Sequence, residues 1–423
     1  MEEEMKQKSN YQKFLLLWVG ELISAVGGGL TSFGLGVYVF AQTGSAANMA
    51  IISLLAFLPG LLLSVPAGIL ADRCDRRLLM MLGDGCSGIG ILFILLCMLR
   101  GDATLTEICV GVAVSSVFSA LLDPAYRATI TDLLDEEEYS KAGGMVSLAG
   151  SARYLVSPLL AGILLAVSDI KLLLVIDICT FFVTVTATGV VRKGLAAKQT
   201  ADREPLAAAL LTGWRAVTEK RGVFLLILLS SVLTCFMGAF QILAEPMILA
   251  FADSTTLGIG ETVCALGMLG TSLLLGARGI KKGYVRVLAA SLCTAGAAMV
   301  FFGLKENIYL ICASGFLFFA MLPLANNCLD YLVRTNIPDE TQGRAWGLIG
   351  FLSQLGYVAA YASAGLMADG LAVRMGSSVG RGAAAVIKAS GGLLVAAALL
   401  LYAVREVREL EKGGVYGTKN NSK

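Results

Sequence analysis

The sequence predicts an all-α membrane protein in which twelve transmembrane helices form two pseudo-symmetric six-helix bundles. Three observations lead to this fold class: the overall hydropathy, the number of long apolar segments, and an internal repeat. The mean hydropathy is +0.77, with 57% hydrophobic and only 15% charged residues. These values lie outside the range of water-soluble globular domains. We therefore expect a multi-pass protein of the cytoplasmic membrane.

Twelve segments are long and apolar enough to cross a bilayer, which takes about 20 mostly apolar residues in a helix. The first half contains Phe14–Ala41, Ala47–Leu70, Leu78–Leu99, Leu105–Ala128, Ala142–Ser168 and Leu172–Val191. The second half contains Val223–Phe251, Leu257–Ala277, Val285–Leu304, Ile308–Val333, Ala345–Leu371 and Ala383–Val404. We expect a cytoplasmic N-terminus (1–13), a first bundle (14–191), a linker (192–222), a second bundle (223–404) and a cytoplasmic tail (405–423).

The loops alternate in their content of basic residues, as expected when Lys and Arg remain on the cytoplasmic side of a membrane. Besides the linker, the loops assigned to the inside contain Lys6, Lys8, Lys13, Arg73, Arg76, Arg77, Arg278, Lys281, Lys282, Arg286, Arg334, Arg344, Arg405, Arg408 and Lys412. The outer loops 42–46 and 252–256 contain no Lys or Arg. The last outer region, with Arg374, Arg381 and Lys388, is the one exception. The alternation places both termini in the cytoplasm.

The linker between the two halves contains a mildly amphipathic stretch, Leu206–Arg221, with Trp214 beside basic residues. This composition predicts a helix on the surface of the inner leaflet.

An internal repeat relates the two halves of the chain. When the first half is shifted by 203 positions, 134–142 falls on 337–345. The same register aligns Gly144 with Gly347 and Ala161-Gly162 with Ala364-Gly365. A single register that holds through a loop and a helix indicates two parallel repeats of six spans each.

A charged turn separates spans two and three. It consists of Gly68, Asp72, Arg73, Arg76 and Arg77, spaced as Gly, three residues, Asp-Arg, two residues, Arg-Arg. This pattern resembles the loop between helices two and three of the major facilitator superfamily of transporters, which usually has Gly where this chain has Asp75. The resemblance implies a gating role, in which Asp72 faces a helix end of the opposite half and pairs with nearby arginines. The alternative is a positive-inside loop without a gating function.

Further segments resemble the drug-exporting branch of that superfamily, which includes macrolide efflux and enterobactin-exporter-like permeases. They are Leu17–Gly27, Asp123–Tyr126, Ile337–Glu340, Gly343-Arg344 and Arg405–Leu410. The resemblance implies proton-driven export of an amphipathic or lipophilic small molecule by alternating access. Two alternatives stay open: a siderophore or lysolipid transporter of the same fold, and a transporter-like sensor or scaffold that moves no solute. No nucleotide-binding loop is present, so ATP is not expected to drive transport.

Candidate coupling residues are carboxylates, because the chain contains no histidine. Glu21 lies in span one, and Asp123 and Arg127 lie one helical turn apart near the inner end of span four. In the superfamily, spans one, four, seven and ten line the cavity, which places these three residues at similar depth. Glu21 is the first candidate for protonation, and the alternative is a static Glu21 to Arg127 bridge.

Other polar residues in the spans are candidates for the substrate cavity, because buried polar groups are costly unless they are satisfied. They are Arg153, Gln241, Glu245, Asn326, Asn327 and Asp330. Arg153 in span five could instead form a structural pair that locks two helices. Asp177 in span six is interpreted as structural and close to the outer water. Polar residues are few, so the predicted cavity is mostly apolar and suits lipophilic substrates.

Small residues and one proline are expected to let helices pack closely or bend. They are Gly144, Pro158, Gly162, Gly347, Gly356 and Gly365. The first three resemble the span-five antiporter motif of the superfamily, in which Arg153 of this chain replaces a glycine.

The remaining composition sets the expected partners. The net charge of +2 gives no indication of nucleic-acid binding. Ten scattered cysteines without a C-x-x-C pair indicate neither a disulfide framework nor a metal site. We expect a non-enzymatic monomer without a cofactor that interacts with membrane lipids, protons and a small-molecule substrate.

Overall fold

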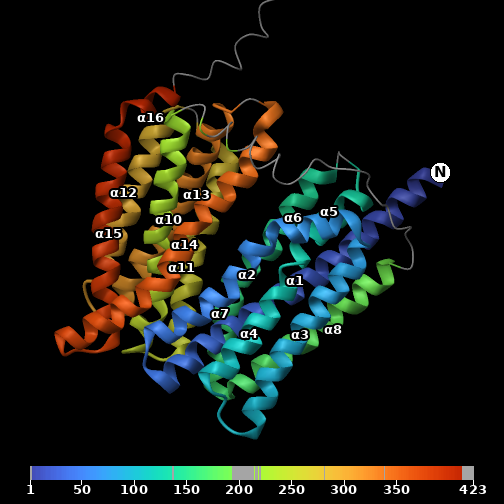
Figure 1. Cartoon of the computed structure of the whole chain (residues 1–423), viewed down its shortest axis with the longest axis horizontal. Coiled ribbons are helices and arrows are strands. Elements are labelled where there is room, and N and C mark those ends of the chain that lie inside the picture. Colours follow the sequence, from blue (N-terminus) through green and yellow to red (C-terminus); the bar gives the residue numbers. More distant parts are fainter. Residues whose placement is uncertain are drawn as a thin grey trace, which may run out of the picture. The chain divides into compact units, whose positions relative to one another are not determined.

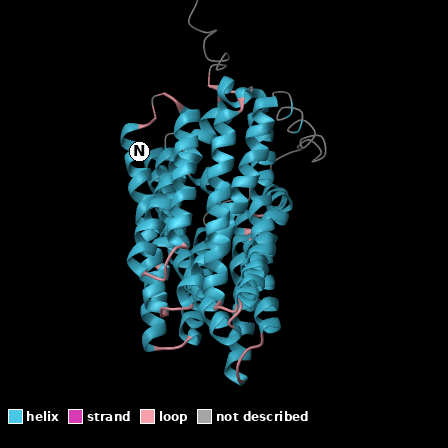
Figure 2. Ribbon diagram, turned by 90° about the vertical axis from the view of Figure 1, so that its left-hand side faces the viewer, coloured by secondary structure: helices cyan, strands magenta, loops and turns pink. Residues whose placement is uncertain are grey.

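The computed structural model describes residues 2–135, 138–192, 214, 218, 221–280, 282–337 and 339–411. Within these ranges the regular structure is helical and contains no strand, so the predicted all-α class is confirmed (Figure 2). The predicted linker helix lies almost wholly outside the described residues.

Fifteen helices are described, with the labels of Figure 1. The helices before the linker are α1 (Glu2–Thr43), α2 (Ala46–Arg73), α3 (Arg76–Arg100), α4 (Leu105–Ser119), α5 (Leu122–Leu133), α6 (Tyr139–Leu155), α7 (Ser157–Val167) and α8 (Ile170–Arg192). Those after it are α10 (Arg221–Leu249), α11 (Ser254–Arg278), α12 (Tyr284–Phe302), α13 (Ile308–Arg334), α14 (Asp339–Met375), α15 (Val379–Ala403) and α16 (Arg405–Leu410).

The chain forms two compact units. The first consists of Met1–Gly44, Ile51–Ala201 and Asp253–Thr262, and the second of Ser45–Ala50, Asp202–Ala252 and Val263–Lys423. The beginning of α2 therefore belongs to the second unit and the beginning of α11 to the first. In the first unit α1 packs against α8 and α6, and α3 against α4 and α8. In the second unit α10 packs against α14 and α15, and α12 against α13 and α15.

Eleven segments of the described chain are long and apolar enough to cross a membrane. They match eleven of the twelve predicted spans. The remaining one, Ala345–Leu371, lies within α14, where the side chains of 341–348 are outside the described set.

Two predicted spans are broken helices, which corrects their continuous assignment. Span four divides into α4 and α5, because Pro124 has no N–H to donate to the carbonyl of Ala120 and its ring crowds that turn. Span five divides into α6 and α7 at Val156, and Pro158 stands in the first turn of α7. Proline is tolerated there because the first N–H groups of a helix need no intrahelical partner.

The first unit has two separate apolar clusters. One contains Phe14, Leu17, Ala71, Leu79, Met80, Ala125, Tyr126, Ile130, Leu133, Leu134, Ala142 and Val191. The other contains Leu35, Val39, Ile52, Ile91, Ile94, Leu95, Met98, Ala103, Ile108, Val112, Ile170 and Leu174. On α1, α3 and α8 the residues between the two clusters include buried polar side chains. The second unit has an aromatic core in which the ring of Phe240 lies 4.1 Å from that of Phe318 and 4.8 Å from that of Phe302, between centroids.

Candidate functional site

The first unit contains a polar layer between its two apolar clusters. We define this layer as Glu21, Thr31, Asp84, Ser87, Ser157, Asp177, Thr180 and Thr184, which come from α1, α3, α7 and α8. Buried polar groups in a membrane-length helix are costly, so a layer of them indicates either a structural network or a path for polar species.

Asp177 lies at the centre of the polar layer and is only 1% exposed. The hydroxyl of Thr31 donates a hydrogen bond of 2.6 Å to its Oδ2, and the hydroxyl of Thr180 lies 3.4 Å from its Oδ1. A Cβ added at Gly27 would come within 2.8 Å of Asp177 Oδ1 and 2.6 Å of Thr180 Oγ1. Glycine is therefore required at this point of α1. Asp177 is thus shielded from solvent by its neighbours, α1 among them, and its predicted depth close to the outer water stays a prediction.

Asp84 is the second buried carboxyl group of the layer, with 4% exposure. It lies close to Thr184 and within electrostatic range of Glu21 and Asp177. Sequence reasoning missed this residue. The available signal was an acidic residue seven positions into span three, deeper than the arginines of the charged turn.

Arg153 is the basic residue that faces the polar layer. It interacts electrostatically with both Glu21 and Asp177. In the described part of the chain it forms no ion pair within 4 Å, so a locked structural pair is not observed. Next to it, the hydroxyl of Ser157 donates to the carbonyl of Val26 at 3.0 Å, which ties α7 to α1. Two of the three carboxyl groups of the layer therefore lie within electrostatic range of one guanidinium, whose side chain is exposed.

Glu21, Asp123 and Arg127 lie near one another, but the static Glu21 to Arg127 bridge is absent. Arg127 Nε instead lies 2.9 Å from both carboxylate oxygens of Asp123, in a pair whose side chains are about two-thirds exposed. Glu21 is half-buried and interacts electrostatically with Asp123. Tyr126 lies within electrostatic range of Glu21 and is 3% exposed, and its hydroxyl finds no hydrogen-bond partner among the described residues. In the same part of the chain, no ion pair to Glu21 lies within 4 Å.

The arginines of the charged turn form ion pairs with a carboxylate that the sequence analysis did not identify. Asp132, at the end of α5, lies 2.8 Å from Arg76 Nη1 and 3.6 Å from Arg77 Nη2. Arg76 also donates to the carbonyls of Ala71 and Ala128 at 3.1 and 2.9 Å. These contacts fasten the beginning of α3 to α5 within the first unit.

The other predicted residues of the turn make fewer contacts. Arg73 is exposed, and a Cβ added at Gly68 would meet open space. The side chain of Asp72 lies outside the described set. Its predicted pairing across the two halves therefore stays a prediction.

Asp75 serves as the N-cap of α3, where its Oδ1 accepts a hydrogen bond of 3.1 Å from the Arg77 backbone N–H. Its Oδ2 accepts from Arg192 Nε at 2.8 Å. Burial alone would raise the pKa of Asp75, but the hydrogen bonds from Arg192 and from the backbone outweigh burial and hold this pKa below its ordinary value.

The second unit has a cavity of about 220 Å³ between α10, α13 and α14. Asn326 and Asp330 line it, one helical turn apart on α13. The other lining residues are Leu226, Ile227, Ser230, Leu233, Thr234, Met237, Leu292, Ala325, Leu329, Val333, Ile349, Gly350 and Ser353. Among the described residues, the lining is thus mostly apolar and includes one acidic side chain, Asp330.

The remaining cavity candidates do not reach this lining. Asn327 is exposed on another face of α13, since consecutive helical residues point about 100° apart. Gln241 and Glu245 lie further along α10 and are half-buried. The hydroxyls of Ser231 and Thr234 each donate a 2.6 Å hydrogen bond to the α14 backbone, and these bonds hold the cavity wall together.

The predicted packing glycines behave differently from one another. A Cβ added at Gly162 would lie 2.7 Å from the Ser254 carbonyl oxygen, and one at Gly365 would lie 2.6 Å from Ala47 Cα. A Cβ at Gly356 would lie 2.7 Å from the backbone nitrogen of Cys235. A Cβ added at Gly144 would meet no described atom within 4 Å, so its predicted packing role stays a prediction. Gly347 lies among the residues whose surroundings are not described.

These features together define an α-helical membrane transporter. Both units consist of membrane-length helices; the first contains a layer of carboxyl groups, and the second contains a mostly apolar cavity lined by helices. Among the described residues, no group of three or more His, Cys, Asp or Glu could hold a metal ion.

The chain belongs to the Major Facilitator Superfamily, whose family model matches residues 17–361. Macrolide efflux protein A of Streptococcus pyogenes is 23% identical over 415 residues, which cover 96% of this chain and 100% of the relative. The staphyloferrin A transporter of Staphylococcus aureus is 24% identical, with coverage of 63% and 65%. The solved structure of a point mutant of the nucleoside transporter NupG has the same fold, with a TM-score of 0.74, 13% identity and coverage of 92% and 99%.

Proposed function

We propose that this protein exports amphipathic or lipophilic small molecules by alternating access, in exchange for protons. The observation that carries the proposal is the polar layer of the first unit, where the buried carboxyl groups Asp84 and Asp177 and the half-buried Glu21 lie together and the exposed Arg153 interacts with two of them. Support for the cargo comes from the mostly apolar cavity in the second unit and from the similarity to a protein named for macrolide efflux.

The polar layer suits proton binding because Asp177 accepts its hydrogen bond from the neutral hydroxyl of Thr31, and both Asp177 and Glu21 lie within electrostatic range of Arg153. A protonated carboxyl is neutral and can remain buried at low cost, whereas an additional negative charge must be compensated. Proton binding at Glu21, Asp84 or Asp177 would therefore change the balance of charge around Arg153. A ligand or proton shifts the equilibrium between two conformations only if it binds one of them more strongly than the other.

We place both termini in the cytoplasm and the charged turn on the cytoplasmic side, with Asp72 as the gating carboxylate. The distribution of Lys and Arg in the loops supports this orientation. The protein would act as a monomer in the cytoplasmic membrane.

A second candidate cargo is a siderophore, and the similarity to a protein named for staphyloferrin A transport favours it. The described lining of the cavity in the second unit is mostly apolar, which favours an amphipathic or lipophilic cargo over a polyanionic one.

The test is transport by the purified protein in proteoliposomes with an imposed pH gradient and a panel of lipophilic fluorescent compounds. We expect pH-driven flux in wild type and a reduction of about tenfold or more in Glu21→Gln and Asp177→Asn, since both remove a titrating group while keeping the side-chain shape. Asp169→Asn, which changes an exposed carboxylate between α7 and α8, is the matched control.

Full flux in both core variants would remove these carboxyls from the coupling mechanism. The absence of solute flux in a correctly inserted wild type would favour a sensor or scaffold instead.

A further inference from the structure

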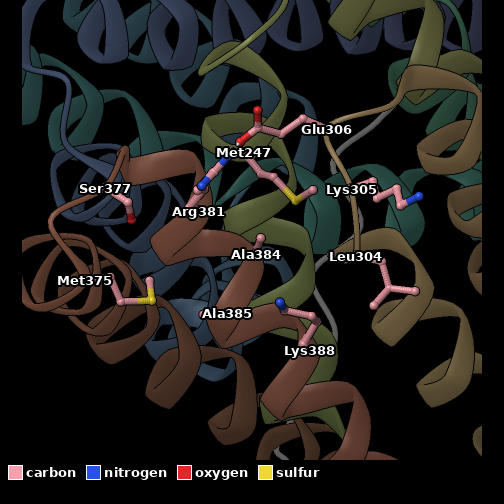
Figure 3. A pocket seen from close by; sticks show the side chains of 11 residues that line it. Met247, Leu304, Lys305, Glu306, Met375, Ser377, Arg381, Ala384, Ala385 and Lys388 are labelled. Atoms are coloured by element: carbon pink, nitrogen blue, oxygen red, sulfur yellow. Dashed lines mark hydrogen bonds and ion pairs between the residues drawn. The ribbon is translucent and has the colours of Figure 1, made fainter.

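A cavity of about 510 Å³ lies at one end of the second unit. Figure 3 shows its lining, which comes from four places. Met247 stands near the end of α10, and Gly303–Glu306 follow α12. Met375 and Ser377 stand where α14 ends, and α15 contributes Arg381, Ala384, Ala385 and Lys388.

The charged side chains of the lining are mostly cationic. They are Lys305, Arg381 and Lys388, with a single carboxylate, Glu306. Arg381 Nε lies 3.4 Å from Glu306 Oε1, in an exposed pair, and the two side chains face each other in Figure 3. Lys388 follows Arg381 by seven positions, so both stand on the same face of α15, about two turns apart. Lys305 points away from both of them.

Lys388 is held in place but not neutralised. It is half-buried, and no ion pair to it occurs among the described residues. A Cβ added at Gly303 would come within 2.8 Å of Lys388 Cγ, so the chain after α12 closes against the lysine stem. A half-buried ammonium group that is not neutralised favours an anion beside it.

Ser377 adds a polar group to the same lining. Its Oγ is buried and has no hydrogen-bond partner in the part of the chain that the structure describes. A buried hydroxyl without a partner costs free energy, and a bound oxyanion could accept its hydrogen bond.

Apolar side chains stand beside these cations. Leu304 and Met375 line the cavity and are each about half exposed. The cavity also lies where membrane-length helices begin and end, which is the level of lipid headgroups. A ligand that meets both surfaces has an anionic group joined to an apolar part.

We propose that this cavity binds a phosphate anion, held by Lys388, Arg381 and Ser377 and carried by the headgroup of an anionic phospholipid. Long basic side chains that extend toward the interface are suited to this contact. The proposal also accounts for Arg381 and Lys388, two of the basic residues by which the last outer region departs from the alternation. It does not depend on the transported substrate or on the driving force.

The test is lipid binding to the purified full-length protein, measured by native mass spectrometry and by thermal unfolding. Phosphatidylglycerol, phosphatidylcholine and inorganic phosphate are the three probes. We expect phosphatidylglycerol to bind more tightly than phosphatidylcholine, and its affinity to fall about tenfold in Lys388→Gln and in Arg381→Gln. Arg374→Gln is the matched control, since Arg374 is an exposed basic residue of the same region outside the cavity.

Each outcome bears on the proposal. Selective binding that both cavity variants weaken and Arg374→Gln does not would support the phospholipid site. Inorganic phosphate that protects wild type alone, without lipid selectivity, would support the anion site and reject its lipid source. Equal affinity for both lipids without phosphate protection, or unchanged phosphatidylglycerol affinity in both cavity variants, would overturn the proposal.

Discussion

Gly27 and Gly28 are adjacent on α1 but have different surroundings. A Cβ on Gly27 would meet Asp177 and Thr180 at less than 3 Å, whereas a Cβ on Gly28 would meet nothing within 4 Å. Because the hydroxyl and carboxylate that Gly27 faces are buried, the neighbouring helix has little freedom to move away. At this position the absence of a side chain allows the polar layer to form.

We predict that Gly27→Ala lowers the free energy of unfolding by about 1–3 kcal/mol, as overpacking of a closed site does. Gly28→Ala should be neutral or stabilising by up to about 1 kcal/mol, because alanine has the higher helix propensity. Thermal unfolding of the two variants in detergent measures the difference. Equal melting temperatures would show that α1 and α8 separate without cost.

The pair of Asp75 and Arg192 makes stability depend on pH. Folding lowers the pKa of Asp75, so the stabilisation is fully present above the ordinary pKa of about 3.9. It is lost as the pH falls through the lower, folded-state value.

Asp75→Asn retains the helix cap and removes the ion pair, so it isolates this pH-dependent contribution. We predict a melting temperature below that of wild type at pH 7, with a difference that narrows below about pH 4. The effect should be about 0.5 kcal/mol, because Arg192 is partly exposed and solvent screens the pair. A difference that does not change with pH would contradict the assignment.

Helix α2 begins at a carboxylate supplied from elsewhere in the second unit. Asp369 of α14 accepts hydrogen bonds from the hydroxyl of Ser45 at 2.6 Å and from the backbone N–H groups of Ala46 and Ala47 at 3.0 and 3.1 Å. An anionic acceptor at a helix N-terminus satisfies donors that the helix itself cannot. Sequence reasoning could not assign this role to Asp369, because Ser45 precedes it by 324 positions in the chain.

We predict that Asp369→Ala destabilises the protein by about 1–3 kcal/mol, since Ala46 and Ala47 are buried and their N–H groups would lose their acceptor. Asp369→Asn keeps a carbonyl acceptor and should cost less than half as much. Thermal unfolding of the two variants is the measurement. Wild-type stability in Asp369→Ala would mean that water replaces the carboxylate at no cost.

Among the elements, membrane-length helices were predictable, but their internal breaks were only partly so. Pro158 indicated a bend in span five, and the helix ends just before it. The break before α5 was not anticipated, although Pro124 provides its physical cause. Proline acts on the turn that precedes it, and neighbouring helices decide whether that turn bends or breaks.

For the whole molecule, the orientation in the membrane is testable with a native residue. Cys74 is exposed in the charged turn. We predict that a membrane-impermeant maleimide labels it in inside-out vesicles and not in intact cells, because a turn rich in arginine remains cytoplasmic. Cys74→Ser gives the background from the other nine cysteines. Labelling from outside the cell would invert the proposed topology.

The candidate site was predictable where one residue carries the signal and not where two distant residues must meet. Glu21, Asn326 and Asp330 could be named because a polar side chain within an apolar span is conspicuous. Asp132 could not be matched to Arg76 and Arg77, from which it is separated by more than 50 positions. Asn327, beside Asn326, points to another face of its helix, and the helix rotation in the bundle decides which of the two lines the cavity.

The amino-acid sequence alone determined the membrane-spanning segments, the predicted two-fold repeat and the family, because hydropathy and motif spacing are local properties. Only the tertiary structure decided that Asp84 and Asp177 share one buried layer, that Asp369 caps α2 and that Lys388 lines a cationic cavity. The physical reason is that helices in lipid are positioned by close packing and by hydrogen bonds between helices. Those contacts join residues whose separation along the chain carries no information about their distance in space.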